Sequence, residues 1–346
     1  MTISDPNAST IANAARVEER SGVTQAEFTA EIAGGYKPVV LRGLVADWPA
    51  VAAGRRSVEA MAHYLMGIAS DAPANVMIGA PQIGGRFFYR DDFDGFNFER
   101  AKVTLAVLLG QLVAQQHDAV VPALYAGAAL VEDSFPGWPA ANPLPLLPPA
   151  AVPRLWLGNA SRVSTHYDIS SNVAAVVAGR RRFALFPPEQ GENLYVGPLD
   201  HTIAGQPASM VDLEAPDLNR HPRFAKALAA MTVAELEPGD AIYIPSMWWH
   251  DVRATGPLNV LVNYWWGRPG EVSPFPALVH ALLAIRDLPV GEREAVRGWF
   301  DTYVFGNRAG QAADHLPSHI RGVLGPPSPE RTQLIRDYLL RTLDRP

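Results

Sequence analysis

The hydrophobic positions between residues 154 and 267 fall in short runs that turn-forming residues interrupt. Each run is rich in Val, Ile, Phe or Trp, and Gly, Pro or Asn bounds it. The runs are RLWLGN, NVAAVVAG, RRFALFPP, GDAIYIP and LNVLVNYWW. Short strands at this spacing are typical of a β-barrel or a jelly roll. We therefore predict a mainly β fold for this region.

The chain before this region alternates between helical and strand-like patterns. We expect helices over 24–35, after the Trp48–Pro49 turn, over 56–68 and over 103–117, a strand that ends at Gly43, and a hairpin over 75–90 around Pro81–Gly85. Residues 133–153 are rich in proline, so an irregular connector is expected there. Because this connector also carries many apolar side chains, we expect it to lie on the body of the protein rather than to link two domains.

The pattern becomes helical again after Pro269. Apolar residues recur at i, i+3 and i+4 in FPALVHALLAIRDL, EREAVRGWFDTYVFG and SPERTQLIRDYLLRTLDR. We predict a first domain over residues 1–270 and a helical region over 271–346. Such apolar helices need a surface to cover them, either their own barrel or another subunit.

Composition limits the chemistry that the chain can perform. It has 346 residues and no cysteine, which excludes disulfides, thiolate zinc sites, iron–sulfur clusters and cysteine nucleophiles. Any metal must therefore be held by imidazole and carboxylate groups. The net charge of −6 does not favour nucleic acid as a partner. With no long apolar run and no signal-peptide pattern at the start, we expect no membrane partner and a cytoplasmic protein.

One pair of residues is suited to metal binding. Of the nine histidines only His166 is followed by an acid two positions later, Asp168. On an extended segment the two side chains point to the same side. His250 follows a Gly-Asp turn and an apolar strand, and could supply a third ligand. Two histidines and one carboxylate are the ligand set of non-haem iron(II) oxygenases. From spacing alone, a buried structural role for His166 and a loop position for His250 remain open.

Longer motifs around these residues carry a family resemblance. HYDISSNVAAVVAGRRRFALFPP, PGDAIYIPSMWWHDV and NVLVNYWW, in this order, resemble the JmjC-like cupin family of iron(II)- and 2-oxoglutarate-dependent oxygenases. KPVVLRGLVADWPA and GRFFYRDDFDGFNF are similar to the N-terminal segments of that family, so the resemblance covers roughly residues 25 to 270. It implies a double-stranded β-helix (jelly-roll or cupin) core with flanking helices, helical N-terminal elements and a helical C-terminal region.

The resemblance also assigns roles to residues. It makes His166, Asp168 and His250 the ligands of an iron(II) ion. The family lysine that pairs with the far carboxylate of 2-oxoglutarate corresponds here to Arg181, a departure that a guanidinium can tolerate because it clamps a carboxylate with two hydrogen bonds. Tyr125 matches a family tyrosine that binds the same carboxylate, although a core position would explain it too.

Two amides complete the expected site. Asn172 and Asn263 stand where the family places amides near the cosubstrate and the iron. A structural role in the hydrogen bonding of the barrel is the alternative for both, because a buried Asn needs partners.

The implied activity is hydroxylation that consumes O2 and 2-oxoglutarate. We expect the substrate to be an amino-acid side chain of a protein or peptide. Demethylation, a small-molecule substrate, a non-catalytic metal-binding cupin and a metal-dependent cupin isomerase are the alternatives. By the same resemblance, the C-terminal helices are expected to form a homodimer, and capping the barrel of a monomer is the other possibility.

Overall fold

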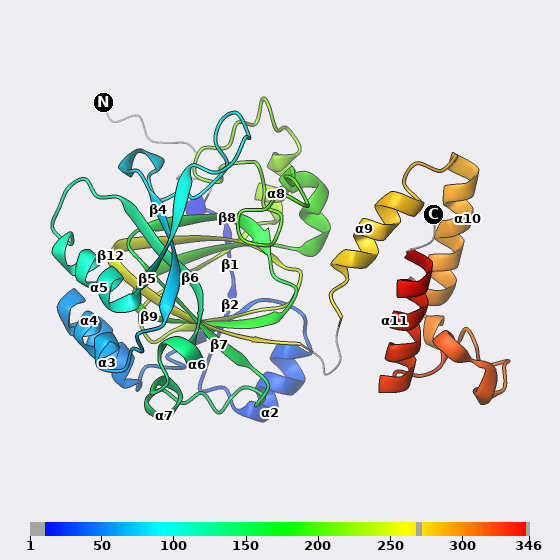
Figure 1. The fold of residues 1–346 in the computed structure, drawn as a ribbon, viewed down its shortest axis with the longest axis horizontal. Helices are drawn as coiled ribbons and strands as arrows, with labels where there is room; N and C mark the ends of the chain where they lie inside the picture. The colour runs from blue at the N-terminus through cyan, green and yellow to red at the C-terminus, as the bar shows by residue number, and fades with distance from the viewer. Residues whose placement is uncertain (1–10, 268–271, 344–346) are drawn as a thin grey trace. The chain divides into compact units, whose positions relative to one another are not determined.

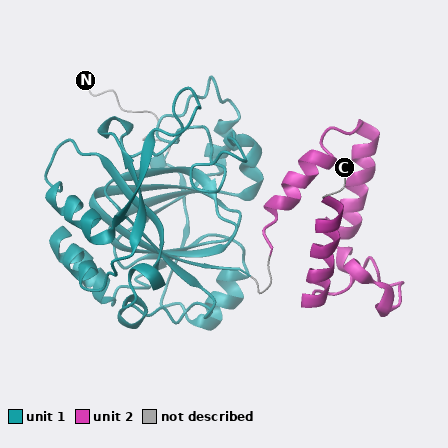
Figure 2. Ribbon diagram, in the orientation of Figure 1, with its two compact units in different colours: residues 1–267 teal, residues 268–346 magenta. Residues whose placement is uncertain are grey.

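The computed structural model describes residues 11–267 and 272–343, which belong to two compact units (Figure 2). The first unit is Met1–Gly267 and the second is Arg268–Pro346. The domain boundary that the sequence predicts at residue 270 lies outside the described residues, as does the beginning of the chain that was inspected for a targeting signal.

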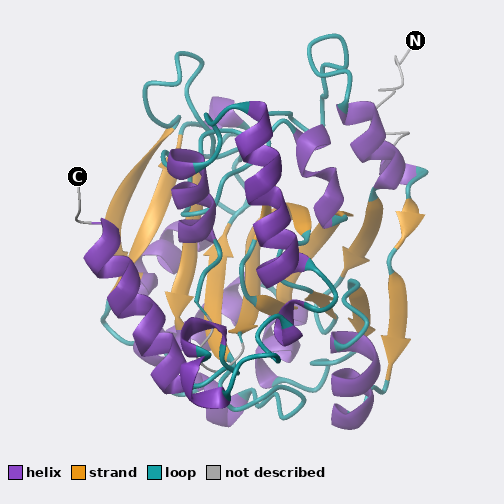
Figure 3. Ribbon diagram, turned by 90° about the vertical axis from the view of Figure 1, so that its right-hand side faces the viewer, coloured by secondary structure: helices purple, strands orange, loops and turns teal. Residues whose placement is uncertain are grey.

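The first unit is built on strands. Their bounds are β1 (Ala15–Arg16), β2 (Glu18–Ser21), β3 (Val39–Arg42), β4 (Pro73–Gly79), β5 (Phe98–Thr104), β6 (Ala123–Leu130), β7 (Val152–Gly158), β8 (Ser161–Tyr167), β9 (Ser171–Phe186), β10 (Thr232–Leu236), β11 (Ala241–Ile244) and β12 (Trp249–Trp266). Within the described residues they form one 12-stranded mixed sheet in the order β2-β3-β11-β9-β12-β7-β6-β4-β5, with β8 on β12 and β10 between β9 and β1 (Figures 1 and 3). The predicted mainly β fold with flanking helices and a jelly-roll or cupin core is confirmed.

Strand β9 shows why an uninterrupted apolar run forms a strand here. Val173, Ala175 and Val177 pack into one hydrophobic cluster with the helices, whereas Ala174 and Val176 pack into a second cluster with residues of β11 and β12. Successive side chains of a strand point to opposite faces, so a strand that is covered on both faces needs apolar residues at every position.

The prediction of two separate strands for NVAAVVAG and RRFALFPP is wrong, because both belong to β9. Gly179 between them has a φ of +75° and bends the strand instead of ending it. A Cβ at this position would lie 2.1 Å from Oδ1 of Asn259 in β12, so the close approach of the two strands requires glycine.

Helices cover one face of the sheet. In the first unit they are α2 (Gln25–Glu27), α3 (Pro49–Arg56), α4 (Val58–Met66), α5 (Leu105–Ala114), α6 (Val131–Ser134), α7 (Trp138–Ala141) and α8 (Phe224–Ala230). The expected helix over 24–35 is confirmed as α2 followed by a π-helical segment, Phe28–Ala33. Ser57 and Thr104 cap α4 and α5 through their hydroxyls, in agreement with the sequence signals for helix starts.

The hairpin predicted over 75–90 is wrong. Strand β4 does pair antiparallel, but its partners are β5 and β6. Pro81–Ile83 form a 3-10 turn, and the following loop makes only isolated bridges such as Tyr89 to Phe96. Pro81 and the glycines after it signal a turn, but a turn signal does not say which later segment will pair with the strand.

The proline-rich connector lies on the body of the first unit, as expected. Phe135 and Trp138 are fully buried, and the ring of Trp138 meets that of Trp48 edge-on at 5.7 Å between centroids. This segment therefore contributes to the core that supports the sheet.

The second unit contains helices α9 (Phe275–Ala284), α10 (Val290–Phe300) and α11 (Pro329–Leu343), which confirms the predicted helical C-terminal region. Among its described residues only Ala313 is a buried hydrophobic residue. No helix in the described parts of the chain is both long enough and apolar enough to cross a membrane.

Candidate metal centre

Strands β8 and β12 bring the three predicted metal ligands together. His166 and His250 are direct partners in the antiparallel pairing of these strands. Asp168 follows immediately after β8, and its carbonyl oxygen accepts a hydrogen bond of 2.7 Å from the backbone N–H of Met247, just before β12. Met247 has a φ of +67°, a strained value for a residue with a side chain, which marks a turn held in place by its surroundings.

The side chains of His166, Asp168 and His250 converge on one point. One ligand atom from each lies within 4.8 Å of the other two. Nε2 of His250 is 3.7 Å from Oδ2 of Asp168, and the two imidazole rings lie 4.4 Å apart between centroids. The structure therefore assembles the two-histidine, one-carboxylate set that the spacing alone could not establish.

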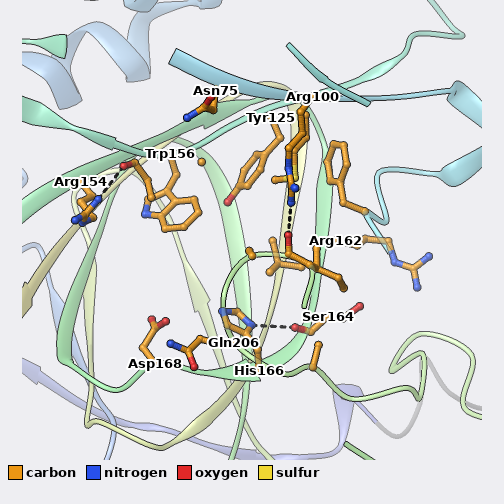
Figure 4. A pocket seen from close by; sticks show the side chains of 18 of the residues that line it. Asn75, Arg100, Tyr125, Arg154, Trp156, Arg162, Ser164, His166, Asp168 and Gln206 are labelled. Atoms are coloured by element: carbon orange, nitrogen blue, oxygen red, sulfur yellow. Dashed lines mark hydrogen bonds between the residues drawn. The ribbon is translucent and has the colours of Figure 1, made fainter. Parts of the chain in front are cut away.

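Backbone hydrogen bonds fix the orientation of both imidazoles. Nδ1 of His166 lies 2.9 Å from the carbonyl oxygen of Ser164, and Nδ1 of His250 lies 3.0 Å from that of Trp248 (Figure 4 shows the first bond). A carbonyl oxygen only accepts, so Nδ1 must carry the proton in each ring. The lone pair of each Nε2 is then free for a metal ion, the arrangement usual for histidine ligands.

Burial shifts the pKa values of two of the three candidate ligands, His250 and Asp168. Burial, together with the neighbouring His166, lowers the pKa of His250 to about 3, so its imidazole is neutral at physiological pH. Burial also raises the pKa of Asp168, and the charge of His166 opposes this effect. A divalent ion between the three side chains would compensate the buried carboxylate.

A small cavity of about 50 Å³ lies beside this centre. Its walls include His166, Asp168 and His250 and the four residues proposed for the cosubstrate, Tyr125, Asn172, Arg181 and Asn263. The structure thus brings all seven predicted site residues to one place.

Arg181 is the unusual feature of this cavity. Only 2% of it is exposed, and its Nε and Nη2 have no hydrogen-bond partner among the described residues. Its neighbours in the run, Arg180 and Arg182, instead form ion pairs with Glu237 and Glu214. Strand alternation therefore separates one buried guanidinium from two that have protein partners, as the sequence predicts.

The other polar groups of the cavity also have unused bonding capacity. Oδ1 of Asn172 and Oδ1 of Asn263 are buried without partners. Burial raises the pKa of Tyr125, with the charge of Arg181 acting in the opposite direction, so its hydroxyl keeps its proton and can donate. Asp168 is the single acidic residue in the cavity wall. Unpartnered buried groups of this kind are costly unless a ligand or water completes them. The two free donors of Arg181 fit a small molecule that carries a carboxylate, whereas the two amide oxygens can only accept and need a donor such as water.

A larger pocket of about 410 Å³ shares His166, Asp168 and Tyr125 with the small cavity. Several residues that line it are not expected from the sequence, among them Arg100, Arg154, Trp156 and Arg162. Each lies on a strand of the sheet, but the sequence gives no signal of their proximity because three different strands, β5, β7 and β8, contribute them. Trp265, from β12, lines both spaces.

Comparison with protein families agrees with this geometry. The model of the cupin-like domain matches residues 25–271. The chain belongs to the cupin-like domain family. The resemblance to JmjC-type members is thereby confirmed over most of the chain, and all three candidate metal ligands of this cupin-like protein lie inside the matched region.

Individual relatives are similar over parts of the cupin-like domain. Lysine-specific demethylase JMJ31 of Arabidopsis thaliana is 38% identical over 32% of this chain, and tRNA wybutosine-synthesizing protein 5 of Danio rerio is 36% identical over 30%. Lysine-specific demethylase 8 of Xenopus tropicalis is 28% identical over 66% of this chain. The chain spans 20%, 28% and 48% of the lengths of these three relatives.

Proposed function

We propose that this protein is an iron(II)- and 2-oxoglutarate-dependent oxygenase that hydroxylates an amino-acid side chain of a protein or peptide. The observation that carries the proposal is the buried guanidinium of Arg181, whose Nε and Nη2 have no partner among the described residues, beside the cluster of His166, Asp168 and His250. A metal site alone would suit many cupins, but a metal site with an adjacent buried cation suits a cosubstrate that chelates the metal and carries a second carboxylate.

The three ligands would hold the ferrous ion on one face and leave positions for the cosubstrate and O2. When bound, iron and 2-oxoglutarate supply the oxidising chemistry, in which 2-oxoglutarate is converted to succinate and CO2 and the substrate gains one oxygen atom. Nε2 of each histidine donates its lone pair, and the carbonyl groups of Ser164 and Trp248 keep both rings in that orientation.

Arg181 and Tyr125 would bind the far carboxylate of 2-oxoglutarate. The guanidinium offers Nε and Nη2, the two unpartnered donors that match a carboxylate in a fork geometry. Burial keeps water from competing for these donors, which strengthens the contact. Asn172 and Asn263 lie in the same wall and would bind the remaining polar atoms of the cosubstrate or its water.

The larger pocket supports an amino-acid side chain as substrate. Its volume of about 410 Å³ is within the range of ligand sites, and it reaches His166 and Asp168 from the outside. Two of the relatives named above are called lysine-specific demethylases, and removal of an N-methyl group begins with the same hydroxylation of a carbon atom. Demethylation is therefore the second candidate function.

Turnover with a peptide library tests the proposal. We expect succinate formation that requires iron(II) and O2, together with a mass gain of one oxygen on a peptide. Succinate coupled only to small molecules would favour a small-molecule oxygenase. Metal binding without any consumption of 2-oxoglutarate would show a non-catalytic cupin.

The C-terminal unit supports the proposal of a homodimer. Large apolar side chains of this unit are exposed, with fractions of 79% for Leu283, 64% for Trp299, 73% for Phe305 and 66% for Leu340. Exposed apolar side chains of this kind indicate a protein interface. Light scattering of the full chain should give twice the monomer mass, and Leu283→Asp with Phe305→Asp should restore the monomer. A monomeric wild type would leave the helices to cap their own barrel.

A further inference from the structure

The walls of the larger pocket carry more positive than negative side-chain charge. Arg100, Arg154 and Arg162 all line it, and Asp168, a candidate metal ligand, is the single acidic residue among the lining residues. In Figure 4, Arg100 and Arg154 lie on either side of Tyr125 and Trp156, and His166 and Asp168 lie at the other end of the pocket. The pocket therefore combines a metal centre at one end with positive charge at the other.

Two of the three arginines have no acidic partner within the described residues. Arg162 is paired with Asp212, whereas neither Arg100 nor Arg154 takes part in an ion pair. The charge of Arg100 and of Arg154 is thus not compensated by the described part of the protein. An anion brought by a ligand would compensate it.

Both guanidinium groups are held in place by neutral contacts. Arg100 donates to the carbonyl oxygen of Ile203 and lies over the ring of Phe98 at 5.3 Å. Arg154 donates to the carbonyl oxygen of Ala128 at 3.2 Å and lies over the ring of Trp265 at 5.3 Å. A guanidinium has five N–H groups, so each arginine retains donors after these contacts. Contacts that fix a side chain before the ligand arrives lower the entropic cost of binding.

Two indole groups add further hydrogen-bond donors. Nε1 of Trp156 and Nε1 of Trp265 are buried and have no hydrogen-bond partner in the part of the chain that the structure describes, and both residues line the pocket. An indole N–H can only donate, so each needs an acceptor from a ligand or from water. The rest of the wall combines apolar side chains, Val76, Met77 and Phe87 among them, with the polar side chains of Asn75, Ser164 and Gln206.

We propose that the substrate is an apolar body that carries a carboxylate, which Arg100 or Arg154 binds while the carbon to be oxidised lies near the metal. The assignment rests on the proposed function, because it names the substrate class of the same site. A positively charged substrate such as a lysine side chain is disfavoured, because it would enter a pocket whose uncompensated charge is already positive.

A pair of fluorescent probes tests the charge preference without turnover. 8-Anilinonaphthalene-1-sulfonate joins an apolar ring system to one anionic group, and N-phenyl-1-naphthylamine has the same rings without it. We expect the full-length protein to bind the anionic probe at least about tenfold more tightly than the neutral one, as a charge-assisted contact provides. Raised ionic strength should reduce this ratio, because part of the site is exposed.

Variants assign the preference to the two arginines. The double variant Arg100→Gln, Arg154→Gln should bring the ratio of the two dissociation constants close to one and leave the affinity for the neutral probe unchanged. Arg56→Gln, an exposed position on α3 outside the pocket, should keep the wild-type ratio. Any binding of the probes to exposed apolar side chains elsewhere is common to the wild type and the variants, so the comparison between them isolates the contribution of the two arginines. An equal ratio in the wild type and the double variant would overturn the proposal.

Competition against the bound anionic probe identifies the source of the carboxylate. Displacement by peptides that contain Glu, but not by matched peptides with Gln, supports a protein substrate. Displacement by phenylalkanoic acids alone supports a small-molecule carboxylate. Stronger displacement by lysine-rich peptides or by an RNA oligonucleotide, or no displacement by either carboxylate source, contradicts the assignment.

The probe measurement separates this inference from the proposed function, because it needs neither metal nor 2-oxoglutarate. A protein with the tenfold preference that forms no succinate would refute the oxygenase and keep the anion site. A protein that turns over 2-oxoglutarate but shows no preference for the anionic probe would refute the anion site and keep the oxygenase.

Discussion

The small inner cavity and the larger outer pocket both contain arginine, and the difference between them lies in burial. Arg181 in the inner cavity is 2% exposed and has no partner for two of its nitrogens, whereas Arg154 is half-buried and Arg100 is exposed. Burying a guanidinium without water or a hydrogen-bond partner costs free energy. Arg181 therefore requires a specific anion. Arg100 and Arg154 in the outer pocket remain partly hydrated. Their contacts with a substrate therefore change its affinity by a moderate factor.

This comparison predicts a graded set of effects. Changes to the inner cavity should abolish or strongly weaken binding of the metal and the cosubstrate. Changes at the rim of the outer pocket should leave both intact.

The largest effect is expected for Asp168→Ala. Removal of the one carboxylate of the ligand set should weaken binding of iron(II) or manganese(II) more than about 100-fold, because two imidazoles alone bind a hard divalent ion poorly. Calorimetric titration with manganese(II) measures this. Asp71→Asn, at an exposed position outside the cavity, is the control and should bind as the wild type does. Unchanged affinity of the alanine variant would place the metal elsewhere.

Arg181→Gln should weaken the binding of 2-oxoglutarate about 10- to 100-fold, because it removes two charge-assisted hydrogen bonds to the far carboxylate. Metal affinity should change little. Arg181→Lys keeps the charge and should retain most of the affinity for 2-oxoglutarate. Retained binding in this variant would show that the loss in Arg181→Gln is not a folding defect. Arg180→Gln, on the exposed face and paired with Glu237, serves as the matched control. Equal effects of the glutamine changes at 180 and 181 would contradict a specific role for the buried residue.

Tyr125→Phe should weaken 2-oxoglutarate less, by about 3- to 10-fold, because it removes one neutral hydrogen bond. The ring itself stacks near Phe87 at 5.9 Å and remains in place. A measurement of KM for 2-oxoglutarate at fixed peptide concentration would show the effect, with kcat nearly constant. A loss confined to kcat would instead put the hydroxyl near the reacting carbon.

The smallest effect concerns Asp212, the ion-pair partner of Arg162. Burial raises the pKa of Asp212, but the guanidinium groups of Arg86 and Arg162 outweigh this, and the net pKa lies below its ordinary value of 3.8. A carboxyl with a lowered pKa stabilises the folded state at pH values above 3.8, and this stabilisation is lost as the pH falls through the folded value. Asp212→Asn should therefore cost about 1 kcal/mol at pH 7 and progressively less in acid.

Urea denaturation across pH checks this prediction, and 2-oxoglutarate affinity should not change in Asp212→Asn. Asp71→Asn again provides the control, because Asp71 is exposed and forms no ion pair with any described residue. If the loss in the free energy of unfolding of Asp212→Asn stays constant down to low pH, the charge of Asp212 is not its cause.

The sequence allowed the metal centre and its neighbours to be predicted because they follow local rules. His166 and Asp168 are two residues apart on an extended segment, and Arg181 alternates with two arginines that face the other way. Family motifs supplied His250, Tyr125, Asn172 and Asn263, whose distance along the chain hides their proximity.

Long-range pairing is where sequence reasoning was wrong or silent. The turn at Pro81–Gly85 was visible, but the partners of β4 lie after further loops. Gly179 was taken as the end of a strand, and only the contact with Asn259 shows why β9 continues. Arg100 and Arg154 come from β5 and β7, at opposite ends of a four-strand path, so no pattern of spacing could bring them together.

A crystal structure with manganese(II) and N-oxalylglycine, an inert mimic of 2-oxoglutarate, tests the central claim most directly. The proposed function requires one metal ion bound to Nε2 of His166, Nε2 of His250 and a carboxylate oxygen of Asp168, each at about 2.0 to 2.3 Å. The far carboxylate of the mimic should contact Arg181 and Tyr125. A metal bound by other residues, or a mimic whose far carboxylate leaves Arg181 without a partner, would contradict it.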